Sequence, residues 1–435
     1  MNLIVVDKCT NYCAYCFAST EMAKNEKRSE LSRDSVEKLI AFVQRSGPKL
    51  DLNIIGGEPF LYKDMPYLLD QLCREPSFGS ATIFTGGIFS TRMLDRIASF
   101  IGRVWLLFNL NERRDYHQSA DYEVVLRNME AALKLGMPLN IGFNIWRSDF
   151  NYQEILSVCR DFGVDRLRWT VAYPEAKPMP GVTVVHPDSY APLASLCAEF
   201  LEAAYEQKIK AYLDCPLPKC FFTSEQLGRI LLTQPESATA IKSCGPAVDV
   251  GSDLSVFRCY ALSGCERRYL NDFENYRDLE SWFERTIDDR YERPQVYEKC
   301  ATCEFAEDRS CYGGCMAHSV QSIGERPATT DLMRMAHESL SAGDWKTATG
   351  ALDKLPRQDA AAALLRSHAS LARGSREDAV HNARLAVNRS RTTAMRNTAV
   401  ALLRSLSPIP SQPDTPTVPL GRQNRSIELP VLRST

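Results

Sequence analysis

Residues 2–16 read NLIVVDKCTNYCAYC, and residues 51–59 read DLNIIGGEP. Each stretch begins with a short apolar run, which is typical of a parallel strand buried on both faces. The first run is followed by three cysteines, and the second by two glycines, a glutamate and a proline. Because parallel strands present their carboxyl ends at one edge of a sheet, we expect these two endings to lie close together.

The same alternation of apolar runs and amphipathic stretches continues through the first 210 residues. Six strands are expected, at 2–7, 51–57, 81–87, 104–110, 138–145 and 166–174, with helices near 31–46, 64–74, 90–101, 121–135, 151–162 and 188–208. Repeated strand–helix units predict an α/β fold with a parallel sheet, either doubly wound or curled toward a barrel.

The composition is that of a folded protein of two or three domains, with 435 residues, 44% of them hydrophobic and 24% charged. The net charge of −2 gives no reason to expect a membrane or nucleic-acid partner. No apolar run approaches the ~18 residues of a membrane span. The opening MNLIVV is cut off by Asp7 and Lys8, so it is too short for a signal peptide. We therefore expect a cytoplasmic protein.

The 15 cysteines are the most informative residues. Twelve of them fall in two groups, whereas Cys73, Cys159 and Cys197 stand alone in helical patterns and are expected to be structural thiols. Stable disulfides are rare in a reducing compartment, so clustered cysteines indicate metal.

The first group is the triplet Cys9, Cys13 and Cys16. Three thiolates on one short loop can ligate three irons of a cubane cluster and leave the fourth iron without a protein ligand. A ferredoxin site would supply a fourth thiolate. A zinc site needs four ligands, or three plus water, and usually includes histidine. The triplet therefore predicts an iron–sulfur cluster with one open iron.

The triplet after a first strand, with Tyr15 before its third cysteine, and the GGEP sequence at the end of a second strand together resemble the radical S-adenosylmethionine (SAM) superfamily. The resemblance implies a partial (β/α)6 TIM-type barrel. It also implies a [4Fe–4S] cluster whose open iron chelates SAM, and reductive cleavage of SAM to a 5′-deoxyadenosyl radical that abstracts hydrogen from a substrate. The residues expected at the SAM site are Tyr15, Gly56, Gly57, Glu58, Pro59, Asn109 and Asn144.

Within that set, Gly56 and Gly57 permit close backbone approach, and the strand edge with Glu58 is expected to receive the amino group of SAM. Asn109 and Asn144 are expected to contact its ribose or carboxylate, with turn formation as the alternative. The sequence departs from the family where residues 85–87 read TGG and residues 109–111 read NLN, without the usual aspartate. Further along, Arg166 and Arg168 share one strand face and either meet a SAM carboxylate or form outer salt bridges.

The second cysteine group lies in residues 211–327, which hold too few apolar residues for a core of their own and are expected to need a metal staple. A hairpin is expected at 247–259. The sequences CATC at 300–303 and CYGGC at 311–315 resemble the SPASM/twitch extension of radical SAM enzymes. That extension holds one or two auxiliary [4Fe–4S] clusters.

The resemblance implies one cluster on Cys300, Cys303 and Cys311, which lack the family's final cysteine. The other would take Cys244, Cys259, Cys315 and one of Cys220, Cys215 or Cys265; we favour Cys220, and Cys265 can serve either cluster. Two alternatives stay open at this point: a pair of structural zinc sites, or a single auxiliary cluster with spare thiols.

Residues 328–406 contain a helical repeat, because 336–348 and 367–379 align at an offset of 31. This pattern resembles a tetratricopeptide-like module, with a plain helical bundle as the alternative. From residue 331 onward, 15 Lys and Arg face 9 Asp and Glu, a net charge of +6. The Pro-rich tail, 407–435, is expected to be disordered.

The expected domains are thus a radical SAM partial barrel at 1–210, an auxiliary cluster domain at 211–327, the helical module at 328–406 and the tail. The leading hypothesis is a radical SAM enzyme that matures a ribosomally made peptide by crosslinking, thioether formation, epimerisation or oxidation of a side chain. The Arg-rich module would dock the peptide or protein substrate, and a flavodoxin or ferredoxin would donate electrons. The alternatives are a radical SAM enzyme acting on a sugar, nucleoside or antibiotic precursor, and a redox or electron-transfer protein without SAM chemistry.

Overall fold

A computed structural model describes residues 1–11, 13–16, 18, 29–47, 49–172, 190–239, 241, 244–291, 300, 302–308, 310–323, 329–353, 355, 360–390 and 393–406. The chain divides into two compact units, Met1–Thr330 and Asp331–Thr435. The predicted disordered tail, 407–435, lies outside the described residues.

One ten-stranded sheet organises the first unit, in the order β10-β9-β8-β1-β2-β3-β4-β5-β6-β7. Strands β1 to β7 pair in parallel, and β8 also pairs in parallel with β1, whereas β9 and β10 run antiparallel to their neighbours. The strands are β1 (Asn2–Ile4), β2 (Leu50–Ile55), β3 (Phe78–Thr85), β4 (Val104–Asn109), β5 (Leu139–Ile145), β6 (Arg166–Val171), β7 (Lys210–Leu213), β8 (Val248–Val250), β9 (Ser255–Arg258) and β10 (Arg267–Tyr269).

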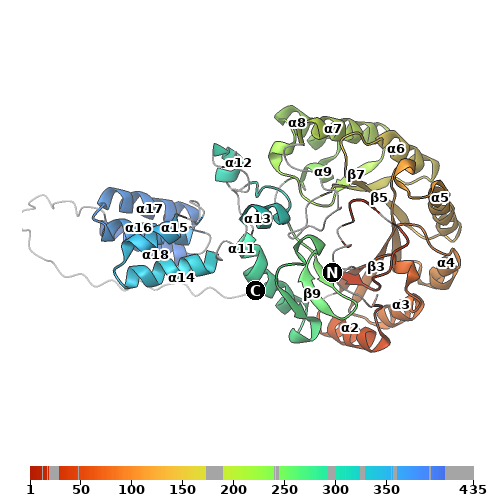
Figure 1. The fold of residues 1–435 in the computed structure, drawn as a ribbon, viewed down its shortest axis with the longest axis horizontal. Helices are drawn as coiled ribbons and strands as arrows, with labels where there is room; N and C mark the ends of the chain where they lie inside the picture. The colour runs from red at the N-terminus through yellow and green to blue at the C-terminus, as the bar shows by residue number, and fades with distance from the viewer. Residues whose placement is uncertain are drawn as a thin grey trace, which may run out of the picture. The chain divides into compact units, whose positions relative to one another are not determined.

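The sheet curls, and helices α2 to α8 lie along its outer side (Figure 1). They pack through apolar faces: in α2, for example, Val36, Leu39, Phe42 and Val43 are buried at helical spacing. The helices of this unit are α2 (Arg33–Arg45), α3 (Met65–Arg74), α4 (Arg92–Ile97), α5 (Ser119–Lys134), α6 (Tyr152–Asp161), α7 (Tyr190–Glu206), α8 (Ser224–Thr233), α9 (Pro235–Thr239), α10 (Tyr276–Phe283), α11 (Asp289–Tyr291), α12 (Glu304–Glu307) and α13 (Met316–Ile323).

The predicted α/β class with a parallel sheet and a helical C-terminal portion is confirmed. The six predicted strands are all present, although β1 is shorter than predicted. Strand β7 was not predicted, because its four residues, KAYL, follow the end of α7 with only a short apolar signal. The predicted hairpin forms β8 and β9 and extends the barrel sheet, so part of the cysteine-rich region shares the core of the barrel.

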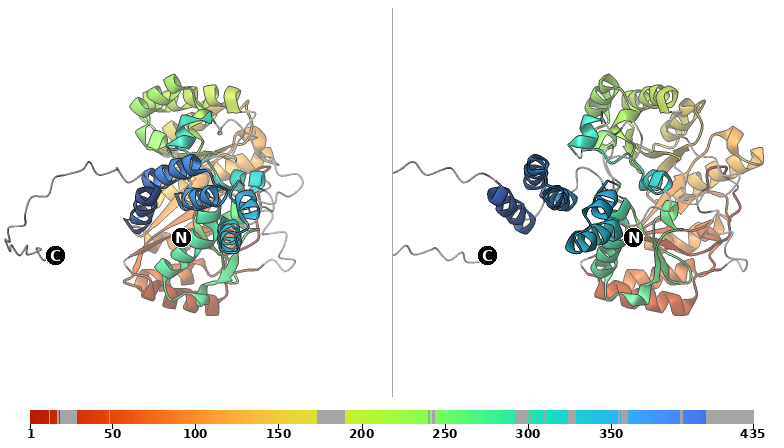
Figure 2. Two further views of the ribbon diagram at one scale, coloured as in Figure 1. Left: turned by 90° about the vertical axis from the view of Figure 1, so that its left-hand side faces the viewer. Right: turned by 60° about the vertical axis from the view of Figure 1, so that its left-hand side comes forward.

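From Thr329 onward, the described residues form five helices, α14 (Thr329–Ser341), α15 (Trp345–Leu352), α16 (Ala360–Ala372), α17 (Arg376–Arg389) and α18 (Thr393–Leu406). Figure 2 shows them from two further directions. The predicted repeat appears as two similar turns. Gly343 and Gly374 have φ angles of 78° and 85°, and their N–H groups donate to the carbonyls of Leu340 and Leu371. The tetratricopeptide relationship itself stays a prediction.

None of the helices in the described parts of the chain combines the length and the apolar character that a membrane crossing requires.

Candidate functional site

The two sequence stretches that predicted the fold meet in space. The Gly57 N–H donates to the Val6 carbonyl at 2.8 Å, and the Glu58 N–H donates to the Lys8 carbonyl at 2.7 Å. A Cβ on Gly56 would lie 2.5 Å from the Val6 oxygen, and a Cβ on Gly57 only 2.0 Å from the Lys8 oxygen. Only glycine fits at these positions. The end of β2 is thereby locked against the backbone from which the cysteine loop starts.

Glu58 ties the ends of β2 and β3 together. Its side chain is 1% exposed and accepts hydrogen bonds from the Thr85 hydroxyl at 2.7 Å, the Gly86 N–H at 2.9 Å and the Phe60 N–H at 3.1 Å. Burial raises the pKa of this carboxyl to about 7, although the three hydrogen bonds act in the opposite direction. Pro59 follows at the start of a short 3-10 helix and is buried. The expected contact of Glu58 with the amino group of SAM stays a prediction.

The cysteine loop is partly buried. The Cys16 N–H donates to the Cys13 carbonyl at 3.1 Å, and the Asn11 N–H lies 3.4 Å from the Cys9 sulfur. Burial raises the pKa of the Cys9 thiol to about 11, against the Asn11 hydrogen bond, and the nearby Cys13 and Glu58 raise it further. Among the described residues, no three His, Cys, Asp or Glu side chains converge on a single metal ion. A cubane cluster holds its ligand sulfurs farther apart than one ion does, so a loop of spaced thiols suits it better.

Asn111, which the sequence reasoning did not select, contacts the cysteine loop directly. Its Nδ2 lies 3.7 Å from the Cys13 sulfur, and its Oδ1 accepts the Tyr15 hydroxyl at 2.5 Å. Its backbone N–H donates to the Tyr116 hydroxyl at 3.2 Å. Asn111 thus replaces the family's usual aspartate with a neutral donor to a cysteine sulfur. The pattern NLN at a strand end carried this signal, but nothing in the pattern favoured its second asparagine over its first.

Asn109 of β4 and Asn144 of β5, both predicted at the SAM site, differ in their hydrogen bonding. Asn109 Oδ1 is buried and has no hydrogen-bond partner within the described part of the chain. It faces Gly142, where a Cβ would lie 2.6 Å away. Asn144 donates to the Tyr15 hydroxyl at 3.2 Å and accepts from Arg168 at 3.4 Å. The unpartnered Asn109 oxygen can therefore accept a hydrogen bond from a ligand, whereas the Asn144 amide already has hydrogen-bond partners within the protein.

The two arginines of β6, Arg166 and Arg168, lie in different environments. Arg168 is 8% exposed and pairs with Asp214 at 2.5 Å, so it lies inside the unit. Arg166 is exposed at the start of the strand, with its guanidinium 5.7 Å from the Tyr212 ring centre. Arg168 therefore forms a salt bridge, but inside the unit, and the contact of the outer Arg166 is with an aromatic ring.

Four thiols from distant segments, Cys215, Cys244, Cys259 and Cys315, influence one another electrostatically; we call them the four-cysteine group. Burial raises the pKa of the Cys315 thiol, and the nearby Cys244, Cys215 and Cys259 raise it further. For Cys259, burial, Asp249, Cys244 and Cys215 act in the same direction. Cys259 also has a φ of 43°, a strained backbone conformation of the kind found at functional sites.

Cys215, rather than the favoured Cys220, acts electrostatically on Cys259 and Cys315, and the assignment of Cys220 to their cluster stays a prediction. The reason is that β7, which was not predicted, ends at Leu213 and delivers Cys215 to the edge of the sheet. Cys220 is exposed and lies next to Lys219, whose N–H points at the Cys311 sulfur at 3.5 Å.

Cys300, Cys303 and Cys311 lie in the segment between α11 and α13. Cys300 and Cys311 are buried, and the Cys303 N–H donates to the Cys300 carbonyl at 3.3 Å. A Cβ on Gly314 would lie 2.7 Å from the Pro218 ring, so the segment carrying Cys220 packs against the CYGGC sequence. Cys265 follows the second strand of the hairpin and is half-buried.

The barrel has a polar pocket of about 630 Å³ just beyond the ends of β4 and β5. Glu112, which lines it, is 2% exposed and pairs with Arg114 at 2.8 Å and with Arg147 at 3.3 Å. The lining residues are Glu112, Arg113, Arg114, Tyr116, Ser119, Asp149, Asn151 and Glu154. None of them was singled out from the sequence, because charged loop residues carry no spacing signal.

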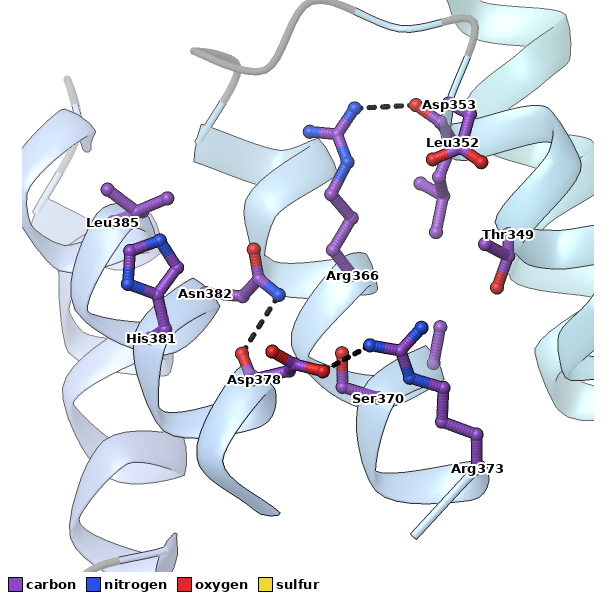
Figure 3. A pocket seen from close by; sticks show the side chains of 11 residues that line it. Thr349, Leu352, Asp353, Arg366, Ser370, Arg373, Asp378, His381, Asn382 and Leu385 are labelled. Carbon is purple, nitrogen blue, oxygen red and sulfur yellow. Dashed lines mark hydrogen bonds and ion pairs between the residues drawn. The ribbon is translucent and has the colours of Figure 1, made fainter. Parts of the chain in front are cut away.

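The helical unit has a pocket of its own, of about 370 Å³, between α15, α16 and α17 (Figure 3). Arg366 donates to the Leu352 carbonyl at 2.5 Å and the Leu355 carbonyl at 2.9 Å, and Arg373 pairs with Asp378. The lining residues are Thr349, Leu352, Asp353, Arg366, Ala369, Ser370, Arg373, Asp378, His381, Asn382 and Leu385. Two arginines and a histidine thus face one concave surface.

Comparison with known families gives a match over the first part of the chain. Residues 3–161 match the model of the Radical SAM superfamily. The matched segment begins in β1 and includes the cysteine triplet, the GGEP sequence, Asn109, Asn111 and Asn144.

Among curated proteins, a GTP 3′,8-cyclase of Mesorhizobium japonicum is 25% identical over 211 residues, which cover 46% of this chain and 60% of that relative. A GTP 3′,8-cyclase of Sinorhizobium medicae is 26% identical over 252 residues, which cover 56% of this chain and 70% of the relative. The chain therefore matches about three fifths of the length of the first of these relatives.

Among solved structures, native anSMEcpe with bound AdoMet has a TM-score of 0.54 and 16% sequence identity, covering 72% of this chain and 88% of that chain. SuiB of Streptococcus suis bound to S-adenosylmethionine has a TM-score of 0.50 and 15% identity, covering 73% and 72%. At these identities the likeness shows a shared fold.

Proposed function

The chain contains a radical SAM domain, and on that premise we propose that it modifies a side chain of a peptide or protein substrate. A [4Fe–4S] cluster on Cys9, Cys13 and Cys16, with SAM at its open iron, supplies reductive cleavage of SAM and hydrogen abstraction from the substrate. A flavodoxin or ferredoxin is the proposed electron donor.

The observation that carries the radical SAM part is the backbone contact between Gly57 and Lys8. It brings the end of β2 to the start of the cysteine loop, with room for no side chain at Gly57. Asn111 and Tyr15 hold Cys13 from the other side. The buried, unpartnered Asn109 Oδ1 offers an acceptor to a ligand N–H or hydroxyl. The residues present therefore fit a cluster with SAM beside it.

We assign two further clusters to eight of the nine remaining clustered thiols. The four-cysteine group has a full set of ligands from this chain, as electron transfer requires. The second set is Cys300, Cys303 and Cys311, with Cys220 as the fourth ligand. The contact between Lys219 and the Cys311 sulfur supports this choice, because Cys220 is the next residue.

The peptide substrate is supported by the second unit. Residues 331–435 carry a net charge of +6 from 15 basic and 9 acidic residues. The pocket between α15, α16 and α17 presents Arg366, Arg373 and His381. Concave surfaces of helical repeats suit extended peptides, and positive charge favours an acidic one. We propose that this pocket docks an acidic segment of the substrate.

A nucleotide is the second candidate substrate. The sequence similarity to GTP 3′,8-cyclases favours it, and the polar pocket beyond β4 and β5 offers Arg113 and Arg114 to an anion. In that pocket both arginines pair with carboxylates, Arg113 with Glu123 at 2.6 Å and Arg114 with Glu112 at 2.8 Å, as Arg373 does with Asp378 in the pocket of the helical unit.

Two probes separate these candidates, both used with the full chain after anaerobic reconstitution. The first is a fluorescein-labelled acidic peptide of ten residues with alternating Glu and Ala, and the second is GTP. We expect the acidic peptide to bind, and the double variant R366Q/R373Q to weaken its binding at least tenfold at constant salt. The matched control is R334Q/R404Q, which removes the same charge from this unit outside the pocket. GTP is expected neither to be consumed nor to stimulate SAM cleavage.

Consumption of GTP with formation of 5′-deoxyadenosine would replace the peptide proposal by the nucleotide one. Equal loss of peptide binding in both double variants would show that net charge, and not the pocket, holds the peptide.

A further inference from the structure

A continuous series of buried polar side chains begins at the cysteine triplet. Asn111 Nδ2 lies 3.7 Å from the Cys13 sulfur, and the Tyr15 hydroxyl donates to Asn111 Oδ1 at 2.5 Å. Asn144 Nδ2 in turn donates to the Tyr15 hydroxyl at 3.2 Å. Asn111, Tyr15 and Asn144 are each less than a tenth exposed. These contacts link the loop after β1 to the ends of β4 and β5.

The series continues to the second cysteine site. Arg168 Nη1 donates to Asn144 Oδ1 at 3.4 Å, and Arg168 Nη2 pairs with Asp214 Oδ2 at 2.5 Å. The Cys215 thiol then donates to the same Asp214 oxygen at 3.8 Å. We call Asn111, Tyr15, Asn144, Arg168 and Asp214 the polar chain. It connects Cys13 with Cys215, a member of the four-cysteine group.

Neighbouring strands give Arg168 its place in the polar chain. In the register of β5 and β6, Arg168 lies opposite Gly142, and a Cβ at Gly142 would come within 3.5 Å of Arg168 Nη1. In the register of β6 and β7, Arg168 lies opposite Tyr212, two residues before Asp214. The Arg168 side chain is 10% exposed but that of Asp214 is 43% exposed, so solvent screens the pair and its contribution to stability is small. Stability alone therefore does not explain a charged pair at this position.

Resting on the proposed function, we propose that Arg168 and Asp214 are positioning residues that set the reduction potentials of the two cysteine sites together, with the polar chain as the connection between them. Cys215 binds iron as a thiolate, so Asp214 would then face a negatively charged sulfur. The Arg168 cation offsets that repulsion on one side, and on the other side it orients Asn144 and, through it, Tyr15.

The sign of the effect follows from charge. Reduction adds an electron to a cluster, so a nearby cation favours the reduced form and a nearby anion disfavours it. Replacing Arg168 removes a cation and lowers the potential. Replacing Asp214 removes an anion and raises it.

The test is a redox titration of the reconstituted full chain, with both clusters followed by electron paramagnetic resonance. We expect R168Q to lower both potentials, D214N to raise both, and R168Q/D214N to return close to the starting values. The control R166Q removes the same charge two residues earlier on β6, where the side chain is exposed, and D161N does so for a carboxylate on α6. A merely structural role for the pair would shift the potentials of R168Q and D214N in the same direction. That result, or a shift at the Cys215 site alone, overturns the proposal.

A second measurement needs no cluster. In the full chain before reconstitution, with tyrosines labelled with ¹³C at Cζ, the Tyr15 signal is assigned by its loss in Y15F. We expect D214N, which changes a 43% exposed side chain, to move this signal, and R166Q to leave it in place. An unmoved Tyr15 signal contradicts the connection. Iron content per chain reports separately on the proposed function, so a chain that binds no iron refutes that function while this signal still decides the connection.

Discussion

The two units of the molecule are built on opposite principles. In Met1–Thr330, the residues that matter most come from distant parts of the chain and meet at backbone distance, as Gly57 meets Lys8. In Asp331–Thr435, each helix packs on its neighbours in the sequence, and two turns with the same geometry recur at Gly343 and Gly374. The first arrangement tolerates little change at its meeting points, whereas the second spreads its stability over similar, local contacts.

The largest expected effect comes from a substitution at the contact between Gly57 and Lys8 in the first unit. In G57A, the new Cβ would lie 2.0 Å from the Lys8 carbonyl oxygen, so the strand end and the cysteine loop must separate. We expect a loss of about 3 kcal/mol of stability, and a loss of SAM cleavage of at least about 100-fold because the two halves of the site no longer meet. Urea unfolding and 5′-deoxyadenosine formation measure the two effects. G47A is the control, since nothing lies within 4 Å of a Cβ there.

The next effect concerns iron. We expect C215A and C220A each to lose about four irons per chain, and the double variant to lose about eight, because the two cysteines serve different clusters. Iron and sulfide analysis after anaerobic reconstitution measures this, with C73A as the control thiol on α3. A double variant that loses no more iron than either single variant would place both cysteines in one cluster.

A smaller effect concerns pH. The pKa of the Glu58 carboxyl is raised from 4.5 to about 7 by burial. Between these values the unfolded chain has released a proton that the folded chain retains, so stability falls as pH rises from about 4.5 to about 7 and is level above that. The contribution is about 3 kcal/mol. In E58Q we expect this part of the fall to vanish, as measured by urea unfolding from pH 4.5 to 8.

The matched control for the pH series is E75Q, which changes a surface carboxyl that accepts hydrogen bonds from Gln44 and Ser77. If E58Q and the unmodified chain show the same pH dependence, Glu58 is ionised throughout this range.

The smallest expected effect concerns the glycine turns of the helical unit. Gly343 and Gly374 have positive φ angles, but nothing lies within 4 Å of a Cβ at either. G343A and G374A are therefore expected to cost about 1 kcal/mol each through backbone strain alone, and their effects should add, because the two turns are separate. Urea unfolding of the single and double variants checks this. A cost at either turn as large as that of G57A would show that the helical unit is not built from local contacts.

Local signals in the sequence predicted much of the barrel. The apolar runs gave the parallel strands, and the triplet with GGEP gave two endings that do meet. The glycine turns of the helical unit could also be predicted from the sequence, because helix, turn and helix are consecutive in the chain.

The parts that the sequence did not reveal depend on distant partners. Strand β7 is recognisable only beside β6, and without it Cys215 was one of two candidate ligands ranked behind Cys220. Asn111 gained its role from the fold of the cysteine loop, and Arg168 from a carboxylate 46 residues away. Spacing rules do not encode such pairings.

The central claim is that the loop of Cys9, Cys13 and Cys16 holds a cluster that cleaves SAM. The most direct test is the formation of 5′-deoxyadenosine and methionine from SAM and dithionite, under anaerobic conditions, by the reconstituted chain and by C13A. We predict both products in equal amounts from the unmodified chain and neither from C13A, while C13A retains the iron of the other sites. Undiminished products from C13A, or none from an unmodified chain that carries iron at the triplet, would contradict the claim.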